Sequence, residues 1–197
     1  MRAERRMTAE SHSQWVSGAV ADLLEEAGWA PGSLDGFAVA AGPGSFTGLR
    51  VGIATVQGLA LATRRPCLGV SSLEALALSA RGQSPTVVAL LDAFRQEVFS
   101  ARFDREGRRL GAPAVGSLER ALDGLSGEVV FVGEMAERSA EVIRARLPGA
   151  RIVPGERFLA AAVGRLALDR FRAGEGRPPG ELRPLYIRDA DIRKPAP

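Results

Sequence analysis

A glycine-rich turn set between an apolar segment and a small-residue segment constrains the fold of this chain more than any other feature. Residues 36–62 read GFAVAA, then GPGSFTGLR, then VGIATVQGLALA. The first part predicts a short buried strand and the last a helix. Gly42 and Gly44 can adopt backbone angles closed to other residues and allow a close approach of backbone or anion. The stretch therefore predicts a strand, a tight loop and a helix in succession.

The loop is a candidate anion site, but it matches neither common phosphate motif. Ser45 and Thr47 are natural N-caps, and free N–H groups of a first helical turn attract anions. A Walker-type loop needs a lysine directly after its last glycine, whereas the nearest basic residue here is Arg50. Gly42, Gly44 and Gly48 also miss the G-x-G-x-x-G spacing of dinucleotide sites. Ser45 and Thr47 either touch a ligand or cap the helix, and capping is the expected role.

Glycines inside the predicted helix imply a close neighbour. Gly48, Gly52 and Gly58 each cost about 1 kcal/mol relative to alanine in a helix interior. Gly48 and Gly52 share one face, which Thr55 and Leu59 continue. We expect this face to pack closely against another helix, either of this chain or of another subunit.

Composition favours an ordinary packed protein. The chain has 197 residues, 46% of them hydrophobic, and no apolar run approaches 18 residues, so no membrane span is expected. The charged N-terminus lacks the apolar segment of a signal peptide. The single cysteine, Cys67, cannot form an internal disulfide and is expected to be a buried small side chain, which suits a reducing cytoplasm. Arginines dominate the net charge of +3, but acids are interspersed among them, which favours a solvated surface over an RNA-binding stripe.

The first predicted helix carries a broad apolar stripe. Ser11 and Gln14 form a capping box, and Gly28 is placed to end the helix after Ala27. Apolar residues recur at helical spacing: Trp15, Val16, Ala19, Val20, Leu23, Leu24 and Ala27. This stripe is wide enough to contact the sheet and a partner, although packing within the chain alone explains it equally well.

No catalytic or metal-binding set emerges from the sequence. His12 is the only histidine, and the position one helical turn later is Val16, so a zinc site or a histidine-dependent triad lacks its residues. Asp92 ends a predicted strand, where it would serve as a base or metal anchor, or more commonly as a cap or ion-pair partner. We therefore predict neither catalytic residues nor a metal site.

Strand-like and helix-like segments alternate along the chain, which predicts an α/β fold with mixed sheets. Predicted strands lie at 67–70, 86–93, 97–103, 128–133 and 150–153, and predicted helices at 72–81, 118–125, 138–147 and 158–171. Residues 82–85 are the best linker candidate. We expect an N-terminal lobe over residues 1–82 and a C-terminal lobe over 83–197.

Several motifs together closely resemble the TsaB (YeaZ) family. They are GPGSFTGLRVGIATVQGLALA at 42–62, Pro66, LGVSSLEAL at 68–76 and, more loosely, LDAFRQEVF at 91–99 and PLYIR at 184–188. Proteins of this family take part in making N6-threonylcarbamoyladenosine in tRNA. The resemblance implies the actin-like ATPase fold, two lobes of mixed sheet flanked by helices, with the last residues returning to the first lobe.

The resemblance also implies a function and an interface. Family members are non-catalytic scaffolds that bind and stabilise the catalytic threonylcarbamoyl transferase subunit (TsaD-like), in a complex with an ATPase subunit (TsaE-like). Catalytic relatives carry an H-x-x-x-H metal motif where this chain has His12 and Val16. Their contact uses the first two helices, which implies the following interface residues here: Trp15, Ala19, Leu23, Gly48, Gly52, Thr55 and Leu59.

Further expectations follow from the same resemblance. The protein is expected in the cytoplasm, reaching tRNA only through the complex, and forming a homodimer when the partner is absent. No cofactor is expected for the chain itself. Weak nucleotide binding in the assembled complex is compatible with this expectation. Family members begin with a β-hairpin that this sequence lacks, so the N-terminal lobe is expected to be truncated, and a start site placed too late is favoured over a true loss. The alternatives are an enzyme in its own right, either an ATP-using transferase or a metallopeptidase, and a direct tRNA-binding module.

Overall fold

The computed structural model describes residues 12–187, and for residues 12–15 the backbone only. The arm or strand expected at residues 1–7, the cap Ser11 and the final Arg188 of the PLYIR motif lie outside this range. Strand β1 (Phe37–Gly42) runs parallel to β2 (Cys67–Ser71), and helix α2 (Phe46–Thr63) connects them. The expected succession of strand, loop and helix is confirmed.

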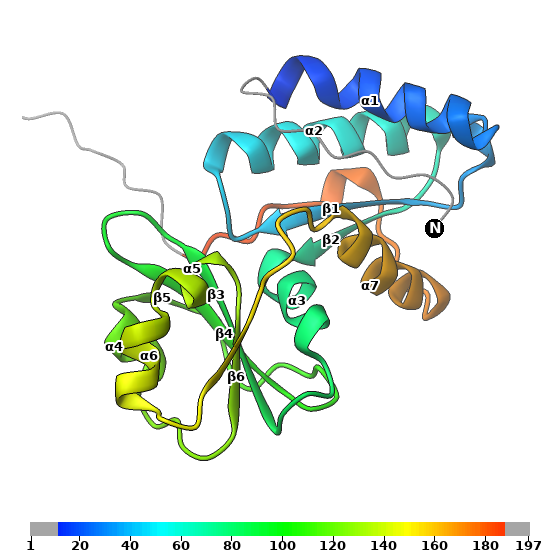
Figure 1. Ribbon diagram of the computed structural model, residues 1–197. Coiled ribbons are helices and arrows are strands. Elements are labelled where there is room, and N and C mark those ends of the chain that lie inside the picture. The colour runs from blue at the N-terminus through cyan, green and yellow to red at the C-terminus, as the bar shows by residue number, and fades with distance from the viewer. Residues whose placement is uncertain (1–11, 188–197) are drawn as a thin grey trace, which may run out of the picture.

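Helices cover both faces of the first sheet, as Figure 1 shows. Strand residues alternate between the two faces. Phe37, Val39 and Cys67 pack with residues of α2, whereas Ala38 and Val70 pack with residues of α7 (Ala160–Arg172). Helix α1 (His12–Ala27) lies on α2, and the 3₁₀ turn η1 (Pro31–Ser33) leads from α1 to β1.

Strand β1 has one open edge. Within residues 12–187 the first sheet contains β1 and β2 alone. The N–H of Phe37 donates to the carbonyl oxygen of Pro66 at 3.1 Å, on the β2 side. Because backbone groups alternate along a strand, those of Ala38 and Ala40 point to the opposite edge. That edge can accept one more strand.

The second sheet has five strands in the order β5-β4-β3-β6-β7. These are β3 (Thr86–Asp92), β4 (Val98–Asp104), β5 (Ala114–Gly116), β6 (Val129–Val132) and β7 (Arg151–Val153). Strand β3 pairs with β4 antiparallel and with β6 parallel, so the sheet is mixed. Helices α4 (Leu118–Leu122), α5 (Glu134–Arg138) and α6 (Ala140–Arg146) contribute to the core on one face. Helix α3 (Ser72–Ala77), continued by the 3₁₀ turn η2 (Leu78–Ala80), packs on the other.

The chain returns to the first sheet after completing the second. Helix α7 packs on β1 and β2. Next, Cys67 and Arg177 exchange two backbone hydrogen bonds, Cys67 N–H to Arg177 C=O at 2.8 Å and Arg177 N–H to Cys67 C=O at 3.0 Å. After the 3₁₀ turn η3 (Pro179–Glu181), the N–H of Leu185 donates to the carbonyl oxygen of Ala41 at 2.7 Å. Residues from both ends of the described chain therefore build the first half of the molecule.

The α/β class with mixed sheet flanked by helices is confirmed. Two elements differ from the prediction. No strand was predicted where β5 lies, and the helix predicted over residues 138–147 begins earlier, at Glu134, and is interrupted at Ser139, where φ is −103° and ψ is 15°. Of the helices that the structure describes, none combines the length and the apolar character needed to cross a membrane.

Candidate partner-binding surface and the glycine-rich loop

The glycine-rich loop is shaped by the returning C-terminal segment. Gly42 has φ +123°, and a Cβ at this position would lie 2.7 Å from the carbonyl oxygen of Leu185. The Gly42–Pro43 peptide bond is cis. The close approach expected at Gly42 thus occurs, and the neighbour is backbone of this same chain.

The two hydroxyl residues of the loop have different positions. Ser45 is the N-cap of α2, and its Oγ accepts from the N–H of Gly48 at 3.3 Å. Thr47 is the second residue of the helix and is exposed, so it does not cap. At Gly44 an added Cβ would find only Leu49, at 4.0 Å. The loop therefore presents a capped helix start rather than a set of side chains arranged around a ligand.

An aromatic cluster that sequence reasoning missed lies beside this loop. The rings of Phe46 and Tyr186 stack with centroids 5.9 Å apart, and the Arg50 guanidinium lies 3.7 Å from the Phe46 centroid. Arg50 Nε also donates to the hydroxyl of Tyr186 at 3.2 Å. The four-residue spacing of Phe46 and Arg50 was a signal for their contact, but nothing in the sequence places Tyr186 there. The cluster fixes the start of α2 against the C-terminal segment.

The predicted glycine face of α2 is turned toward the interior of the chain. A Cβ on Gly52 would lie 3.2 Å from Cγ2 of Val39 in β1, and Leu59 packs against the same core. Thr55 Oγ1 donates to the carbonyl oxygen of Val51 at 2.9 Å. The expectation that the close neighbour is a helix is wrong for Gly52, because the neighbour is a strand of this chain.

A different face of α2 is open. Its exposed residues fall on one arc of the helix: Phe46, Thr47, Arg50, Ala54, Gly58, Leu61 and Ala62. Nothing lies within 4 Å of a Cβ built on Gly58, and the Leu61 side chain is 73% exposed. We call these seven residues the outer arc of α2. Its small and apolar residues are available to another molecule.

Helix α1 has an apolar face that the chain covers incompletely. Ala19, Leu23 and the other residues of the predicted apolar stripe from Val16 onward are half-buried, and none belongs to the buried core. The helix packs on α2. The side chain of Trp15 is outside the described part. The apolar face of α1 therefore retains surface for a second contact.

The candidate catalytic groups are engaged in structural contacts. Asp92 Oδ1 accepts from the N–H of Phe94 at 2.7 Å, and Oδ2 lies 3.7 Å from Nη1 of Arg138. Cys67 is buried, and burial raises the pKa of its thiol, which disfavours the nucleophilic thiolate. Among residues 12–187, no three His, Cys, Asp or Glu side chains are grouped to hold a metal ion.

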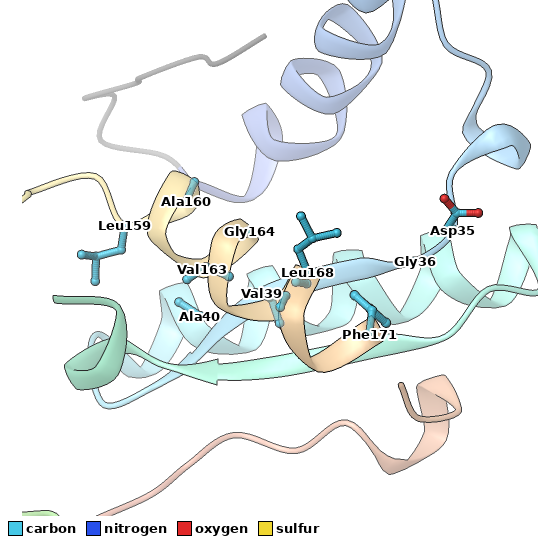
Figure 2. A pocket seen from close by; sticks show the side chains of 12 residues that line it. Asp35, Gly36, Val39, Ala40, Leu159, Ala160, Val163, Gly164, Leu168 and Phe171 are labelled. Atoms are coloured by element: carbon cyan, nitrogen blue, oxygen red, sulfur yellow. The ribbon is translucent and has the colours of Figure 1, made fainter. Parts of the chain in front are cut away.

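A groove near the site lies between β1 and α7. It has a volume of about 580 Å³ and is lined by Asp35 and Gly36, by Ala38–Ala40 of β1, and by Leu159 and residues of α7 (Figure 2). Apart from Asp35, the side chains in it are aliphatic or aromatic, and Phe171 is the largest. A binding site for a polar small molecule needs several convergent polar groups, which this groove does not offer.

Comparison with known proteins defines the class of this fold. The sequence profile of the family "TsaD: tRNA N6-adenosine threonylcarbamoyltransferase" matches residues 6–152. A transferase of that name from Methylobacterium sp. (strain 4-46) is 36% identical over 142 residues, which cover 68% of this chain but 41% of the transferase. The chain therefore shares a domain with these transferases and spans less than half their length.

More specific relatives agree over nearly the whole chain. The tRNA threonylcarbamoyladenosine biosynthesis protein TsaB of Escherichia coli (strain K12) is 30% identical over 205 residues, covering 95% of this chain and 85% of that protein. The structure of YeaZ from Pseudomonas aeruginosa superposes with a TM-score of 0.78 at 32% identity, covering 92% of this chain and 86% of that one. This chain belongs to the TsaB (YeaZ) family. The family resemblance drawn from the glycine-rich loop and the expected α/β fold with a mixed sheet flanked by helices are confirmed.

Proposed function

We propose that this chain takes part in forming N6-threonylcarbamoyladenosine in tRNA as a non-catalytic subunit that binds and stabilises the catalytic threonylcarbamoyl transferase. The relative from Escherichia coli carries the biosynthetic role in its name, and the transferases share the matched domain. A chain related both to a biosynthesis protein and to part of a transferase suits a partner of that transferase.

The observation that carries the proposal is the pair of incompletely covered helices. The outer arc of α2 exposes Ala54, Gly58 and Leu61, and the apolar face of α1 is half-buried along its described length. An interior glycine such as Gly58 weakens a helix by about 1 kcal/mol, and no close packing within residues 12–187 offsets that cost. A helix of another subunit lying against this arc would supply the close packing that the sequence implied.

The non-catalytic part of the proposal is supported by the groups that would otherwise react. The Asp92 carboxylate is held by a backbone N–H and by Arg138, and the Cys67 thiol is buried with a raised pKa. We propose that the chain needs no cofactor of its own, works in the cytoplasm and meets an ATPase subunit only within the complex. Without the transferase, the same two helices would form a homodimer.

Placing an arginine at the centre of the outer arc tests the proposal. Ala54→Arg preserves helix propensity but puts a charge into the apolar contact, so co-purification with the organism's transferase subunit is expected to fall at least tenfold. Ala145→Arg makes the same change at an exposed position of α6 and is expected to bind normally. Equal recovery of the transferase by all three proteins would show that α2 is not the interface.

A further inference from the structure

A pocket at the far end of α2 gathers three arginines from distant parts of the sequence. Arg64 and Arg65 follow the last turn of α2, and Arg177 lies beside β2 in the returning segment. All three line one pocket of about 440 Å³, together with Ala60, Leu61, Pro66, Gly176, Pro178 and Pro179. The pocket lining therefore contains three cations, no carboxylate and an otherwise apolar wall.

The fold itself holds these arginines in place. Arg64 is the C-cap of α2 in the left-handed conformation, with φ 55°. Arg65 Nη2 donates to the carbonyl oxygen of Gly32 at 2.9 Å, and the backbone of Arg177 is hydrogen-bonded to Cys67. These contacts fix the backbone at all three positions, so a ligand would have to order only the side chains.

The charges of two of these arginines are not neutralised within the described chain. Neither Arg64 nor Arg177 pairs with a carboxylate of residues 12–187. The acids nearest to Arg177 in sequence are Glu175 and Glu181. They line a neighbouring cavity of about 300 Å³, and Arg177 lines both cavities. Guanidinium groups bind phosphate through paired hydrogen bonds, and a pocket of this size accommodates one nucleotide unit.

We infer that this arginine pocket binds a backbone phosphate of RNA, with the ribose against Leu61 and the prolines. The inference rests on the proposed place in tRNA modification for the identity of the nucleic acid, and it goes beyond an indirect contact through the complex. The pocket lies at the end of α2 opposite the Phe46–Tyr186 cluster. Leu61 belongs both to the outer arc and to the pocket lining, so RNA at this end would lie directly beside a partner centred on Ala54.

The test measures binding of the organism's unmodified tRNA to the full chain by fluorescence anisotropy. The salt concentration is varied from about 25 to about 200 mM, because affinity that depends on phosphate contacts falls steeply over this range. The double variant R64Q/R177Q keeps the Cβ–Cγ–Cδ part of each side chain and the left-handed backbone at residue 64, but removes two charges. It is expected to bind roughly tenfold more weakly, with a slope of log affinity against log salt lower by about 1.5. Arg144→Gln, an exposed arginine of α6, removes a matched charge elsewhere and is expected to change neither quantity.

The remaining outcomes overturn the inference. If R144Q weakens binding as much per charge as the double variant, the pocket is not an RNA site. The same conclusion follows if the wild type does not bind tRNA at the lowest salt concentration, about 25 mM. If ATP binds in a calorimetric titration and only ATP binding is lost in the double variant, the ligand is a free nucleotide instead. If the double variant loses the transferase in co-purification, the pocket belongs to the protein interface. Since A54R tests the subunit contact separately, failure of one idea leaves the other intact.

Discussion

At the scale of single residues, Gly133 is more tightly constrained than any residue of the glycine-rich loop. It follows β6, adopts φ +117°, and an added Cβ would collide with the carbonyl oxygen of Leu90 and lie 2.7 Å from Cδ2 of Leu76. The sequence EVVFVG predicted only the end of a strand there. Nothing local indicates that β3 and α3 close over this position, because both come from earlier parts of the chain.

Gly133→Ala is therefore expected to destabilise the protein strongly. Backbone strain and overpacking each contribute about 1–3 kcal/mol, so the free energy of unfolding should fall by about 3 kcal/mol or more. The control is Gly124→Ala, which also has positive φ (+69°) but no atom within 4 Å, and which should cost about 1–2 kcal/mol. Urea unfolding of both variants measures the difference; equal losses would show that the collision with Leu90 is relieved by relaxation.

At the scale of elements, α2 shows which features the sequence pattern predicts and which it does not. All three elements β1, α2 and β2 were predicted, the strands from their short apolar runs and the helix from its small residues and capping serine. The side of α2 that meets the sheet was not, because glycines occur on both sides: Gly52 faces Val39, while Gly58 faces open space. A glycine in a helix reports that close packing is permitted there, and only the tertiary structure shows whether it occurs.

These two glycines should respond oppositely to alanine. In the isolated chain, Gly58→Ala is expected to raise the free energy of unfolding by about 0.5–1 kcal/mol, since it gains helix propensity without a clash. At Gly52 the new methyl would lie 3.2 Å from Val39, so Gly52→Ala should gain less or become destabilising. Thermal melting of both variants without a partner gives the comparison. A larger gain for Gly52→Ala than for Gly58→Ala would contradict the assigned orientation of α2.

At the scale of the whole molecule, α3 joins the two sheets. Leu73 and Leu76 are buried in the core beneath β3 and β4, while Ala75 is buried with β2 and α7. Glu74 and Arg170 connect α3 to α7, with Nη2 of Arg170 3.1 Å from each carboxylate oxygen of Glu74. An element shared by both cores should make them unfold together.

Leu73→Ala tests this coupling. Removing a fully buried leucine side chain should cost about 2–5 kcal/mol. Hydrogen exchange measured on peptides covering β1 and β3 should then accelerate by the same factor in both. Leu168→Ala, at a half-exposed position of α7, serves as the mild control. Acceleration confined to β3 would show that the two sheets unfold independently.

The features that could be predicted from the sequence are those that depend on residues close together in the chain. Strand and helix segments were recognisable because their patterns are local, and the family resemblance supplied the overall fold. The hydrogen bond from Leu185 to Ala41 and the stacking of Tyr186 on Phe46 join residues far apart in the chain. Such contacts leave no periodic signal, so the surroundings of the glycine-rich loop could be described only from the structure.

The return of α7 and residues 177–185 to the first sheet has a consequence for how the protein is made. The ribosome extends a chain from its N-terminus, so β1 and β2 emerge long before the segments that cover one face of their sheet. The strands of the second sheet all lie between residues 86 and 153, so that half has only shorter loops to close and can complete its core earlier. During synthesis, the first sheet thus begins before the second but is completed after it, because its apolar strands stay uncovered until α7 and residues 177–185 have been translated.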